Sequence, residues 1–312
     1  MARSTTLVEV THQLGDVPCR VFFKNELEQP SGSFKLRGIG HLISKQLAEK
    51  EPGKTKVHVY SSSGGNAGLA AVYASRELGV PCTVVLPKWS AAVVENLEKL
   101  GATVIMFGDH WGIADDHLRN VVIKNAPSDV QTVYVHPFDD PVIWDGHASL
   151  VDEIQTQLSP NDVKAIRGVV CSVGGGGLYN GVVEGLKRNG MDQTSVLAIE
   201  TFQTPTFSRA VENGKVVTLS SIKTTTTSLA SPYLSQKALE NYREGRTVVK
   251  MVDDLEAKSA AEKYHEMFGK KVEASCGAAL TAVLGRKEFL QELGLTKDDI
   301  VVVVVCGGVV GI

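Results

Sequence analysis

The sequence lacks any long uninterrupted run of apolar residues. No window approaches the ~20 apolar residues that a membrane-spanning helix needs, and the opening MARSTTLVEVTHQLGDV has no apolar core followed by small residues. The sequence also lacks an excess of charge, because 32 Lys and Arg stand against 35 Asp and Glu, giving a formal net charge of -3. We therefore expect neither a membrane nor nucleic acid as a partner.

Closely spaced cysteine pairs are missing as well. The chain has five cysteines, and no two of them form a C-x-x-C motif. This spacing argues against a disulfide framework and against a structural zinc site, and it is typical of a protein from a reducing compartment. We therefore expect a cytoplasmic protein. The cysteines are Cys19, Cys82, Cys171, Cys276 and Cys306.

Internal repeats and low-complexity linkers are absent too, although the run TTTTS at 224–228 is unusual and reads as a surface loop. With 312 residues, of which 43% are hydrophobic, the chain is long enough for one large domain or two of ordinary size. What it contains instead is a regular alternation. Short β-branched runs such as VHVY, PCTVVLP and SVLAIET are each followed by a turn and a longer amphipathic stretch.

This alternation predicts an α/β fold with twisted, mainly parallel sheets covered by helices on both faces. The most apolar runs are IRGVVCSV at 166–173 and IVVVVV at 300–305. A loop, YVHPFDDPVIWDGH at 134–147, separates two groups of predicted strands. We therefore expect two sheets, and two domains with a cleft between them.

A glycine-rich turn, SVGGGGLYNG at 172–181, joins a predicted buried strand to a predicted helix. Without Cβ atoms, consecutive backbone N–H groups can close around an anion, and the helix N-terminus adds the positive end of its dipole. The turn is not a Walker A loop, because no G-K-[ST] follows, and four consecutive glycines match G-x-G-x-x-G only weakly. The pattern favours a phosphate site over a merely flexible turn.

A second turn, SSSGGNAG at 61–68, also lies between a predicted strand and a predicted helix. Its serine hydroxyls, amides and Asn66 side chain at a helix N-terminus suit a carboxylate. Ordinary helix capping explains the same residues equally well. The turn therefore predicts a site for an anionic substrate only in combination with other signals.

A third stretch, SGSFKLRG at 31–38, places Lys35 beside Phe34 at the start of a predicted helix. On its own Lys35 is a surface charge. Together with a phosphate site and a carboxylate site, however, an amine beside an aromatic ring meets the needs of pyridoxal phosphate (PLP) acting on an amino acid. Cys306 follows the last predicted strand, at the edge where an open sheet presents ligands, although a buried cysteine is commonly just a small apolar residue.

At this point the sequence resembles the fold-type II family of PLP enzymes, which are tryptophan synthase β-like. Within that family it resembles most closely the eukaryotic, fungal-type L-serine/L-threonine dehydratases. The resemblance extends over about residues 20–308 and its motifs occur in family order. These motifs are QPSGSFKLRG, SSGGNAG, VHPFDDPVIWDGHAS, VCSVGGGGLYNG, SCGAAL and VVCGG.

The resemblance implies a role for each matching residue. Lys35 is the catalytic lysine that forms the Schiff base, and Cys306 is the partner of the pyridine nitrogen. The other implied contacts to PLP are Phe34 and Ser228 on opposite faces of the ring, Asn66 at the 3′-oxygen, and Gly174, Gly175, Gly176, Gly177 and Leu178 at the phosphate.

The substrate site implied by the resemblance consists of Ser63, Gly64 and Asn66, which bind the carboxylate, and Phe138, which lines the pocket. The resemblance also implies a monovalent cation, for which K⁺ is the candidate. Its implied ligands are the Glu200 carboxylate and the backbone carbonyls of Leu229 and Ser231, and oxygen ligands of this kind suit a hard cation.

The implied domains are a large PLP-binding domain made of residues 1–30 and 141–312, and a small domain made of residues 31–140. The implied reaction is β-elimination, which converts L-serine, and L-threonine as well, to a 2-oxo acid and ammonia. Lys35 acts as the general base and the cofactor phosphate assists the departing hydroxyl. The resemblance further implies a homodimer that serves amino-acid catabolism and gluconeogenesis.

The sequence departs from the family pattern at several points. STTLVEV replaces a T-P-L segment, EASCG replaces E-P-A-C-G, Val309 stands where a hydroxyl residue is usual, and the chain stops at Ile312 without the usual C-terminal helix. These departures predict reduced activity more than an altered fold. Serine racemase, cysteine synthase and a PLP-binding protein without turnover remain alternatives. A nucleotide-dependent oxidoreductase is disfavoured, because no acidic residue follows a first-strand glycine motif at the required distance.

Overall fold

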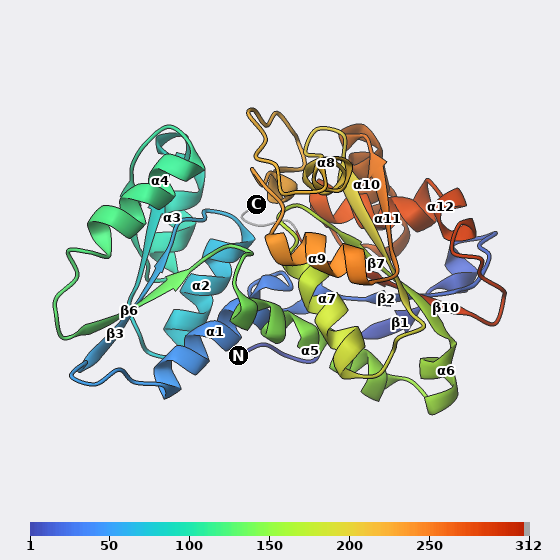
Figure 1. The fold of residues 1–312 in the computed structure, drawn as a ribbon, viewed down its shortest axis with the longest axis horizontal. Coiled ribbons are helices and arrows are strands. Elements are labelled where there is room, and N and C mark those ends of the chain that lie inside the picture. The colour runs from blue at the N-terminus through green and yellow to red at the C-terminus, as the bar shows by residue number, and fades with distance from the viewer. Residues whose placement is uncertain (309–312) are drawn as a thin grey trace.

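The computed structural model describes residues 1–308, apart from the side chains of residues 89, 91 and 92. Val309 and Ile312, which the sequence comparison singled out, lie outside the described residues. The described strands form two sheets, one of six strands and one of four. Figure 1 shows the smaller sheet and its helices at the left and the larger sheet at the right. The predicted α/β fold is confirmed.

The six-stranded sheet has the order β1-β2-β10-β7-β8-β9, and the four-stranded sheet has the order β5-β4-β3-β6. All neighbouring strands are parallel except β1 and β2. The bounds of the strands are β1 Leu7–Glu9, β2 Arg20–Lys24, β3 Lys56–Ser61, β4 Cys82–Leu86, β5 Thr103–Met106, β6 Val130–Val135, β7 Ile166–Ser172, β8 Ser195–Thr201, β9 Thr247–Val252 and β10 Ile300–Val304.

The helices connect these strands in the predicted alternation. Their bounds are α1 Lys35–Ala48, α2 Asn66–Glu77, α3 Ala91–Lys99, α4 Trp111–His117, α5 Pro141–Gln157, α6 Pro160–Ala165, α7 Gly177–Arg188, α8 Thr206–Asn213, α9 Gln236–Glu244, α10 Asp254–Phe268, α11 Ala274–Leu284 and α12 Glu288–Gln291. A short π-helix, Leu118–Val122, continues α4.

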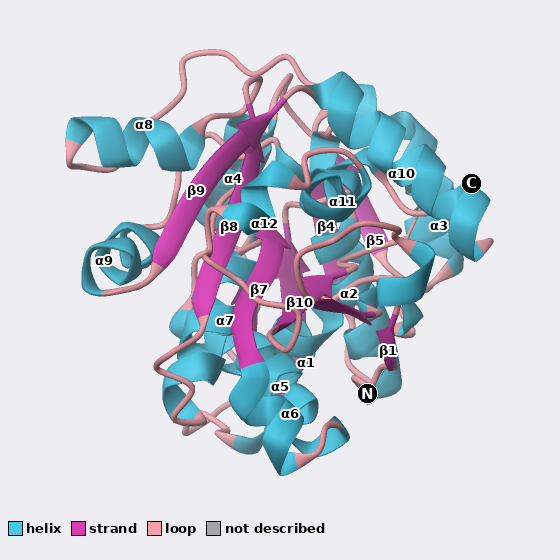
Figure 2. Ribbon diagram, turned by 90° about the vertical axis from the view of Figure 1, so that its right-hand side faces the viewer, coloured by secondary structure: helices cyan, strands magenta, loops and turns pink. Residues whose placement is uncertain are grey.

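The strand order determines which face of each sheet a helix covers. The chain moves outward in the large sheet from β7 through α7 to β8, and it returns from β9 through α10 and α11 to β10. Because parallel crossovers are right-handed, these two connections lie on opposite faces. Figure 2 shows β9, β8, β7 and β10 side by side among the helices. The helices cover the two faces of the sheet, and the loops that follow the strands lie at the carboxyl ends of the strands.

The apolar patterns explain the two cores. All five residues of β10 are buried, as expected for a central strand covered on both faces. One buried cluster fills the space around the six-stranded sheet, and a second, containing Leu36, Ile39 and Val84, lies between the four-stranded sheet and its helices. We therefore keep residues 31–140 as our proposed small domain.

The predicted loop at 134–147 is largely wrong. The structure has the strand β6 up to Val135 and the helix α5 from Pro141, so only residues 136–140 form a loop. Asp140 caps α5 by accepting hydrogen bonds from the N–H groups of Val142 and Ile143, and Pro141 occupies the first turn, where its missing N–H costs nothing. The proline that looked like a chain breaker therefore starts a helix.

The run TTTTS forms more than a surface loop. Thr226 is buried, and the Asp254 carboxylate accepts hydrogen bonds from the hydroxyls of Thr224, Thr225 and Thr226 at 2.7, 3.2 and 3.1 Å. The Thr225 N–H donates to the same carboxylate at 2.6 Å. This anchors the loop that ends at Ser228 to the start of α10.

Candidate functional site

The turn before α1 carries Lys35, and the segment that follows β10 holds this turn in place. The Phe34 N–H donates to the Cys306 carbonyl at 3.0 Å, and the Gly308 N–H donates to the Gly32 carbonyl at 2.9 Å. Gly32 has φ 80°, a conformation that glycine adopts without strain. These bonds bring together two predicted site residues, Lys35 and Cys306, from opposite ends of the chain.

The Lys35 amine is enclosed by groups from both sheets' loops. Its Nζ donates to the Pro137 carbonyl at 2.5 Å and lies 5.1 Å from the centroid of the Phe34 ring. Burial lowers the pKa of Lys35 to about 8, against the opposing charge of Glu273. A pKa near 8 leaves an appreciable fraction of the amine neutral and nucleophilic near neutral pH.

A buried salt-bridge cluster fixes the start of α1. The Arg37 guanidinium lies 2.6 Å from carboxylate oxygens of both Glu26 and Glu153, and the Lys24 amine lies 2.6 Å from Glu153. Arg37 and Glu26 are buried. Because removing one partner of such a cluster leaves a buried charge unpaired, the cluster restricts α1, and with it Lys35, to one position.

Glu273 lies at the centre of a hydrogen-bonded cluster that the sequence did not predict. Asn66 Nδ2 donates to its Oε1 at 2.8 Å, and the Ser228 hydroxyl donates to its Oε2 at 2.7 Å. Burial raises the pKa of Glu273, while these two hydrogen bonds and Lys35 lower it. The residue begins the segment EASCG, just before the matching motif SCGAAL, and this position was the available signal.

Asn66 and Ser228, both predicted to contact PLP, are therefore brought together by Glu273. The Asn66 Nδ2 also lies 3.4 Å from the Ser228 hydroxyl. The other amide atom of Asn66, Oδ1, is buried without a hydrogen-bond partner among the described residues. A buried, unpaired acceptor costs free energy unless something outside the described chain pairs with it.

The glycine turn follows β7 and leads into α7. Gly176 has φ 91° and is the N-cap of α7, and Gly177 is its first residue. Amides in the first turn of a helix have no intrahelical acceptor, and in the described part of the chain no other group accepts from those of Gly177 and Leu178. Leu178 is buried. The turn therefore presents unpaired donors at the positive end of the helix dipole.

The structure gives a second reason for the glycines. A Cβ on Gly174 would lie 2.7 Å from the Leu229 carbonyl oxygen, and one on Gly177 would lie 2.8 Å from the Phe138 carbonyl oxygen. A Cβ on Gly175 would overlap the Phe138 ring. The sequence indicated only that glycines let amides close on an anion. In the fold they also let two other loops pack against the turn.

Cys306 follows β10 and therefore lies next to the glycine turn, because β10 pairs with β7. The thiol is buried. The interaction with the Cys276 side chain and burial raise the pKa of Cys306 well above its usual value, so the thiol keeps its proton. Cys276 was not among the predicted site residues.

The serine turn joins β3 to α2. The Ser63 hydroxyl accepts a hydrogen bond from the Gly65 N–H at 3.3 Å. A Cβ on Gly64 would meet the side chains of Val93 and Leu86 at 3.0 and 3.2 Å, and a Cβ on Gly68 would overlap the Ser63 carbonyl. Ser63 and Gly64 therefore lie in a turn packed closely on α2, at the same end of the helix as Asn66.

Phe138 is predicted to line the substrate pocket, and its ring is buried among aromatic neighbours. The ring centroid lies 4.6 Å from that of His136 and 5.2 Å from that of Tyr233. His136 and Phe138 follow β6, while Tyr233 precedes α9, so the contact joins loops from the two sheets. His136 and Tyr233 were not predicted.

Glu200, the predicted carboxylate ligand of a cation, is buried near the end of β8. Its two oxygens accept hydrogen bonds from the N–H groups of Phe207 and Ser208, both at 2.7 Å. Burial raises the pKa of Glu200 to about 7. Leu229 lies against the glycine turn, and the Ser231 hydroxyl donates to the Tyr233 carbonyl at 2.6 Å. Within residues 1–308, no three His, Cys, Asp or Glu side chains form a metal-binding group.

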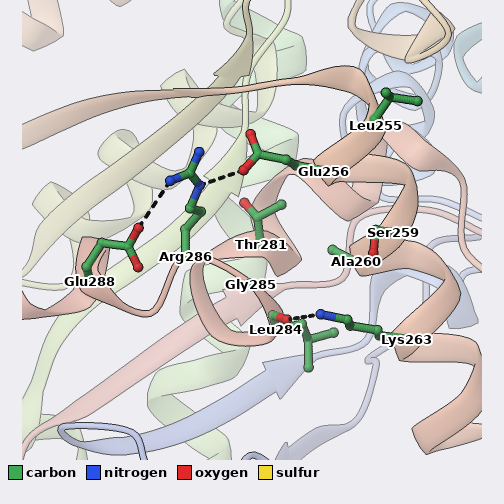
Figure 3. Close-up of a pocket in the computed structure, with 10 residues that line it drawn as sticks. All are labelled: Leu255, Glu256, Ser259, Ala260, Lys263, Thr281, Leu284, Gly285, Arg286 and Glu288. Atoms are coloured by element: carbon green, nitrogen blue, oxygen red, sulfur yellow. Dashed lines mark hydrogen bonds and ion pairs between the residues drawn. The ribbon is translucent and has the colours of Figure 1, made fainter.

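A separate cavity of about 470 Å³ lies between α10 and α11. Figure 3 shows Arg286 between Glu256 and Glu288 on one side of it, and the Lys263 amine bound to the Leu284 carbonyl on the other. None of the predicted site residues lines it. The candidate site is instead formed by the loops that carry Lys35, Asn66 and Cys306.

This constellation can be compared with known proteins. Residues 2–307 match the family described as pyridoxal-phosphate dependent enzyme. The chain belongs to this family. As a PLP-dependent enzyme it uses the cofactor that the sequence predicted.

Individual relatives of this PLP-dependent enzyme carry related names. The chain is 39% identical to an L-serine dehydratase of Saccharomyces cerevisiae (strain YJM789), over 97% of this chain and 92% of that one. It is 40% identical to the L-serine dehydratase/L-threonine deaminase of Mus musculus, over 92% of this chain and 85% of that one. The crystal structure of a fungal L-serine ammonia-lyase from Rhizomucor miehei superposes with a TM-score of 0.88 at 33% identity, covering 99% of this chain and 95% of that one.

The residues of the site fit PLP. The unpaired, buried Asn66 Oδ1 and the unpaired amides of α7 are groups that lack partners within the described chain. An amine with a pKa of about 8 and a protonated thiol lie in the same site. A phosphate, a covalent carbonyl partner and a polar ring would match this set.

The helices of residues 1–308 fall short of a membrane-spanning segment. None of these described helices reaches both the length and the apolarity that such a segment needs.

Proposed function

We propose that the protein catalyses β-elimination of L-serine, and of L-threonine as well, to give a 2-oxo acid and ammonia. The observation that carries this proposal is the full-length similarity to L-serine dehydratases, with Phe34, the neighbour of Lys35, hydrogen-bonded to the backbone of Cys306. Bound PLP supplies electron withdrawal from the α-carbon of the amino acid, which makes the α-proton acidic.

Lys35 is the residue we propose to hold the cofactor covalently and, once displaced by the substrate amine, to take the α-proton at Nζ. Its pKa of about 8 supports this role, because the neutral amine is both the nucleophile and the base. The Pro137 carbonyl, 2.5 Å away, orients the amine. Phe34, whose ring centroid lies 5.1 Å from the Lys35 amine, would pack on one face of the ring and Ser228 on the other.

The remaining contacts divide between phosphate, ring and substrate. The amides of Gly174–Gly177 and Leu178 would bind the phosphate, and Asn66 the 3′-oxygen. Cys306 would meet the pyridine nitrogen as a neutral thiol, which donates or accepts one hydrogen bond but does not protonate the ring as an aspartic acid would. A weaker electron sink of this kind favours prompt loss of a β-leaving group.

For the substrate, we propose that Ser63, Gly64 and Asn66 at the start of α2 bind the carboxylate, because helix N-termini attract anions. Phe138 would limit the space at the β-carbon, where threonine has one more methyl group than serine. Glu273 shares hydrogen bonds with Asn66 and Ser228 and faces Lys35, so it would balance the charge of the amine.

We further propose a monovalent cation at Glu200 and the carbonyls of Leu229 and Ser231. The contact of Leu229 with Gly174 supports this, since a cation there would stiffen the phosphate turn. Steady-state rates in K⁺ and in tetramethylammonium salts at equal ionic strength test it.

We also propose a homodimer, a cytoplasmic location and a role in gluconeogenesis. Analytical ultracentrifugation tests the homodimer.

The decisive experiment is a visible spectrum of the purified protein before and after addition of L-serine, with pyruvate and D-serine assayed in the same sample. We expect a cofactor band, its change with serine, and pyruvate formation. Lys35→Ala should abolish both the band and pyruvate. A band that persists in this variant would disprove the covalent role of Lys35.

One contact supports an alternative function, that of a serine racemase. The Ser228 hydroxyl donates to the buried Glu273 carboxylate at 2.7 Å, a pair that could deliver a proton to the face opposite Lys35. Accumulation of D-serine faster than pyruvate would favour racemisation over elimination. A cofactor band without either product would instead favour a PLP-binding protein without turnover.

A further inference from the structure

The loop of residues 136–140 makes two contacts on which the site depends. Its Pro137 carbonyl accepts the hydrogen bond from the Lys35 amine at 2.5 Å. Its Phe138 ring and backbone occupy the space left by the missing side chains of Gly175 and Gly177. The position of this one short loop therefore affects both the lysine and the glycine turn.

His136 provides the hydrogen bonds that shape the loop. Its Nδ1 accepts from the N–H of Phe138 at 3.2 Å and from the N–H of Asp139 at 2.7 Å. A nitrogen that accepts from two amides carries no proton of its own, so the ring proton lies on Nε2. The imidazole thus satisfies two amides of a loop that has no regular secondary structure.

The other side of the His136 ring is fixed from the opposite sheet. Nε2 lies 3.2 Å from the Tyr233 hydroxyl, which can accept its proton. The Tyr233 hydroxyl and the Asp139 carboxyl also interact, and burial and this interaction raise the pKa of Tyr233. Two residues further on, the Ser235 N–H donates to the Gly175 carbonyl at 2.9 Å. Tyr233 therefore holds the imidazole from the segment that also holds the glycine turn.

Burial keeps the imidazole in this state. The pKa of His136 is lowered to about 4 by burial, so the ring stays neutral and Nδ1 stays an acceptor. The histidine is therefore a fixed acceptor with a fixed orientation.

We propose that His136 is a positioning residue: its Nδ1 folds the 136–140 loop so that Pro137 holds the Lys35 amine and Phe138 supports the glycine turn. Tyr233 sets the orientation of the ring. The inference rests on the proposed function only in that Lys35 is taken as the lysine that binds PLP. It assigns His136 no contact with cofactor or substrate.

A matched pair of variants separates the acceptor from the ring. In His136→Asn, Oδ1 occupies the place of Nδ1 and accepts from the same two amides, but nothing reaches Tyr233. In His136→Leu, the side chain branches at the same atom but offers no acceptor. His12→Leu, on an exposed histidine, is the control for the exchange itself.

The measurement is PLP binding by apo-protein, followed by the visible band and by equilibrium dialysis, with kcat and KM for L-serine measured beside it. We expect His136→Leu to bind PLP on the order of tenfold or more weakly, because two buried amides lose their acceptor. We expect His136→Asn to recover most of that lost affinity. Tyr233→Phe should resemble His136→Asn, because both variants lose only the contact between the ring and the Tyr233 hydroxyl. The His12→Leu control should match the unmodified protein.

Two outcomes would overturn the proposal. One is a His136→Leu protein that binds PLP as the unmodified protein does. The other is a His136→Asn protein as impaired as His136→Leu, which would mean that the ring and not the acceptor matters. If His136→Leu does not fold, judged by circular dichroism, the asparagine variant decides alone by binding PLP or failing to. Because PLP binding is measured without substrate, a failure to deaminate serine would reject the proposed function without touching this inference.

Discussion

The site contains two strand-to-helix turns that look alike in sequence and are built differently. The turn after β7 is all glycine, and its neighbours Phe138 and Leu229 occupy the directions in which side chains would point. The turn after β3 combines serines with glycines. A Cβ on its Gly65 would meet nothing nearer than the Ser63 hydroxyl at 4.0 Å.

The serine turn is also closely packed at Gly64 and Gly68, so the difference lies in the donors that each turn offers. The glycine turn offers only backbone donors, and the loops packed on it leave those donors one arrangement. The serine turn offers hydroxyls whose rotamers can change with the ligand. A phosphate is the same in every substrate complex, whereas the amino acid is exchanged in each turnover. The rigid turn suits the former and the adaptable turn suits the latter.

The strongest test of this contrast is Gly175→Ala. The added methyl group overlaps the Phe138 ring, and overpacking of this kind costs about 1–3 kcal/mol. We expect PLP to bind about ten- to hundredfold more weakly, as measured by titrating apo-protein and following the visible band. Affinity within twofold of the unmodified protein would show that the turn is not rigid.

The second test uses the Lys35 amine, which the Pro137 carbonyl holds in the same site. Because the pKa of Lys35 is about 8 and the neutral amine reacts with the cofactor, uptake of PLP should accelerate as pH rises. The neutral fraction grows from about one-tenth at pH 7 to about nine-tenths at pH 9. Stopped-flow absorbance of apo-protein mixed with PLP measures this rate. A rate that does not vary over this range would contradict the lowered pKa.

Glu273→Gln should shift the pH dependence of the rate of PLP uptake, and we expect this effect to be smaller than the previous two. Glu273 binds Asn66 from the serine-turn side and Ser228 from the other, and its charge raises the pKa of Lys35. Removing the charge should lower that pKa and move the midpoint of PLP uptake to lower pH. A midpoint that does not move would mean that Glu273 is protonated, and therefore uncharged, in the free protein.

The smallest effect is expected for Gly65→Ala, the counterpart of Gly175→Ala. The new methyl group has open space, so PLP affinity should change by no more than about twofold. KM for L-serine should rise slightly, because the methyl group lies beside the Ser63 hydroxyl. A loss as large as that of Gly175→Ala would remove the distinction between the two turns.

Much of this architecture could be predicted from the sequence, and the exceptions share a cause. Strands such as β10 were evident, because a central strand is a continuous apolar run. The start of helix α5 was not predicted, because Pro141 interrupts the apolar pattern of the sequence and was therefore assigned to a loop, whereas in the structure it occupies the first turn of the helix. Its Asp140 cap was visible in the sequence, but only the fold shows that the cap is used.

The site divides in the same way. Lys35, Asn66 and Cys306 stand next to glycines in motifs that the resemblance identified. Glu273 and His136 lie in or beside the matching segments as well, but neither residue type indicated a role there. Glu273 acts through Asn66, 207 positions away. The His136 Nδ1 accepts within its own loop, but the ring is oriented by Tyr233, 97 positions away. Side chains that act through distant partners leave little trace in local patterns.

The pairing of Ser33 with Gly307 has a consequence for how the protein is made. The lysine turn is synthesised early, but its backbone hydrogen-bond partners, Cys306 and Gly308, are synthesised near the end of the chain, after β10. The ribosome must therefore complete β10 and the residues after it before the lysine turn acquires its final shape. Cofactor loading on the nascent chain should wait for this point, and ribosome-bound chains truncated before β10 should not take up PLP.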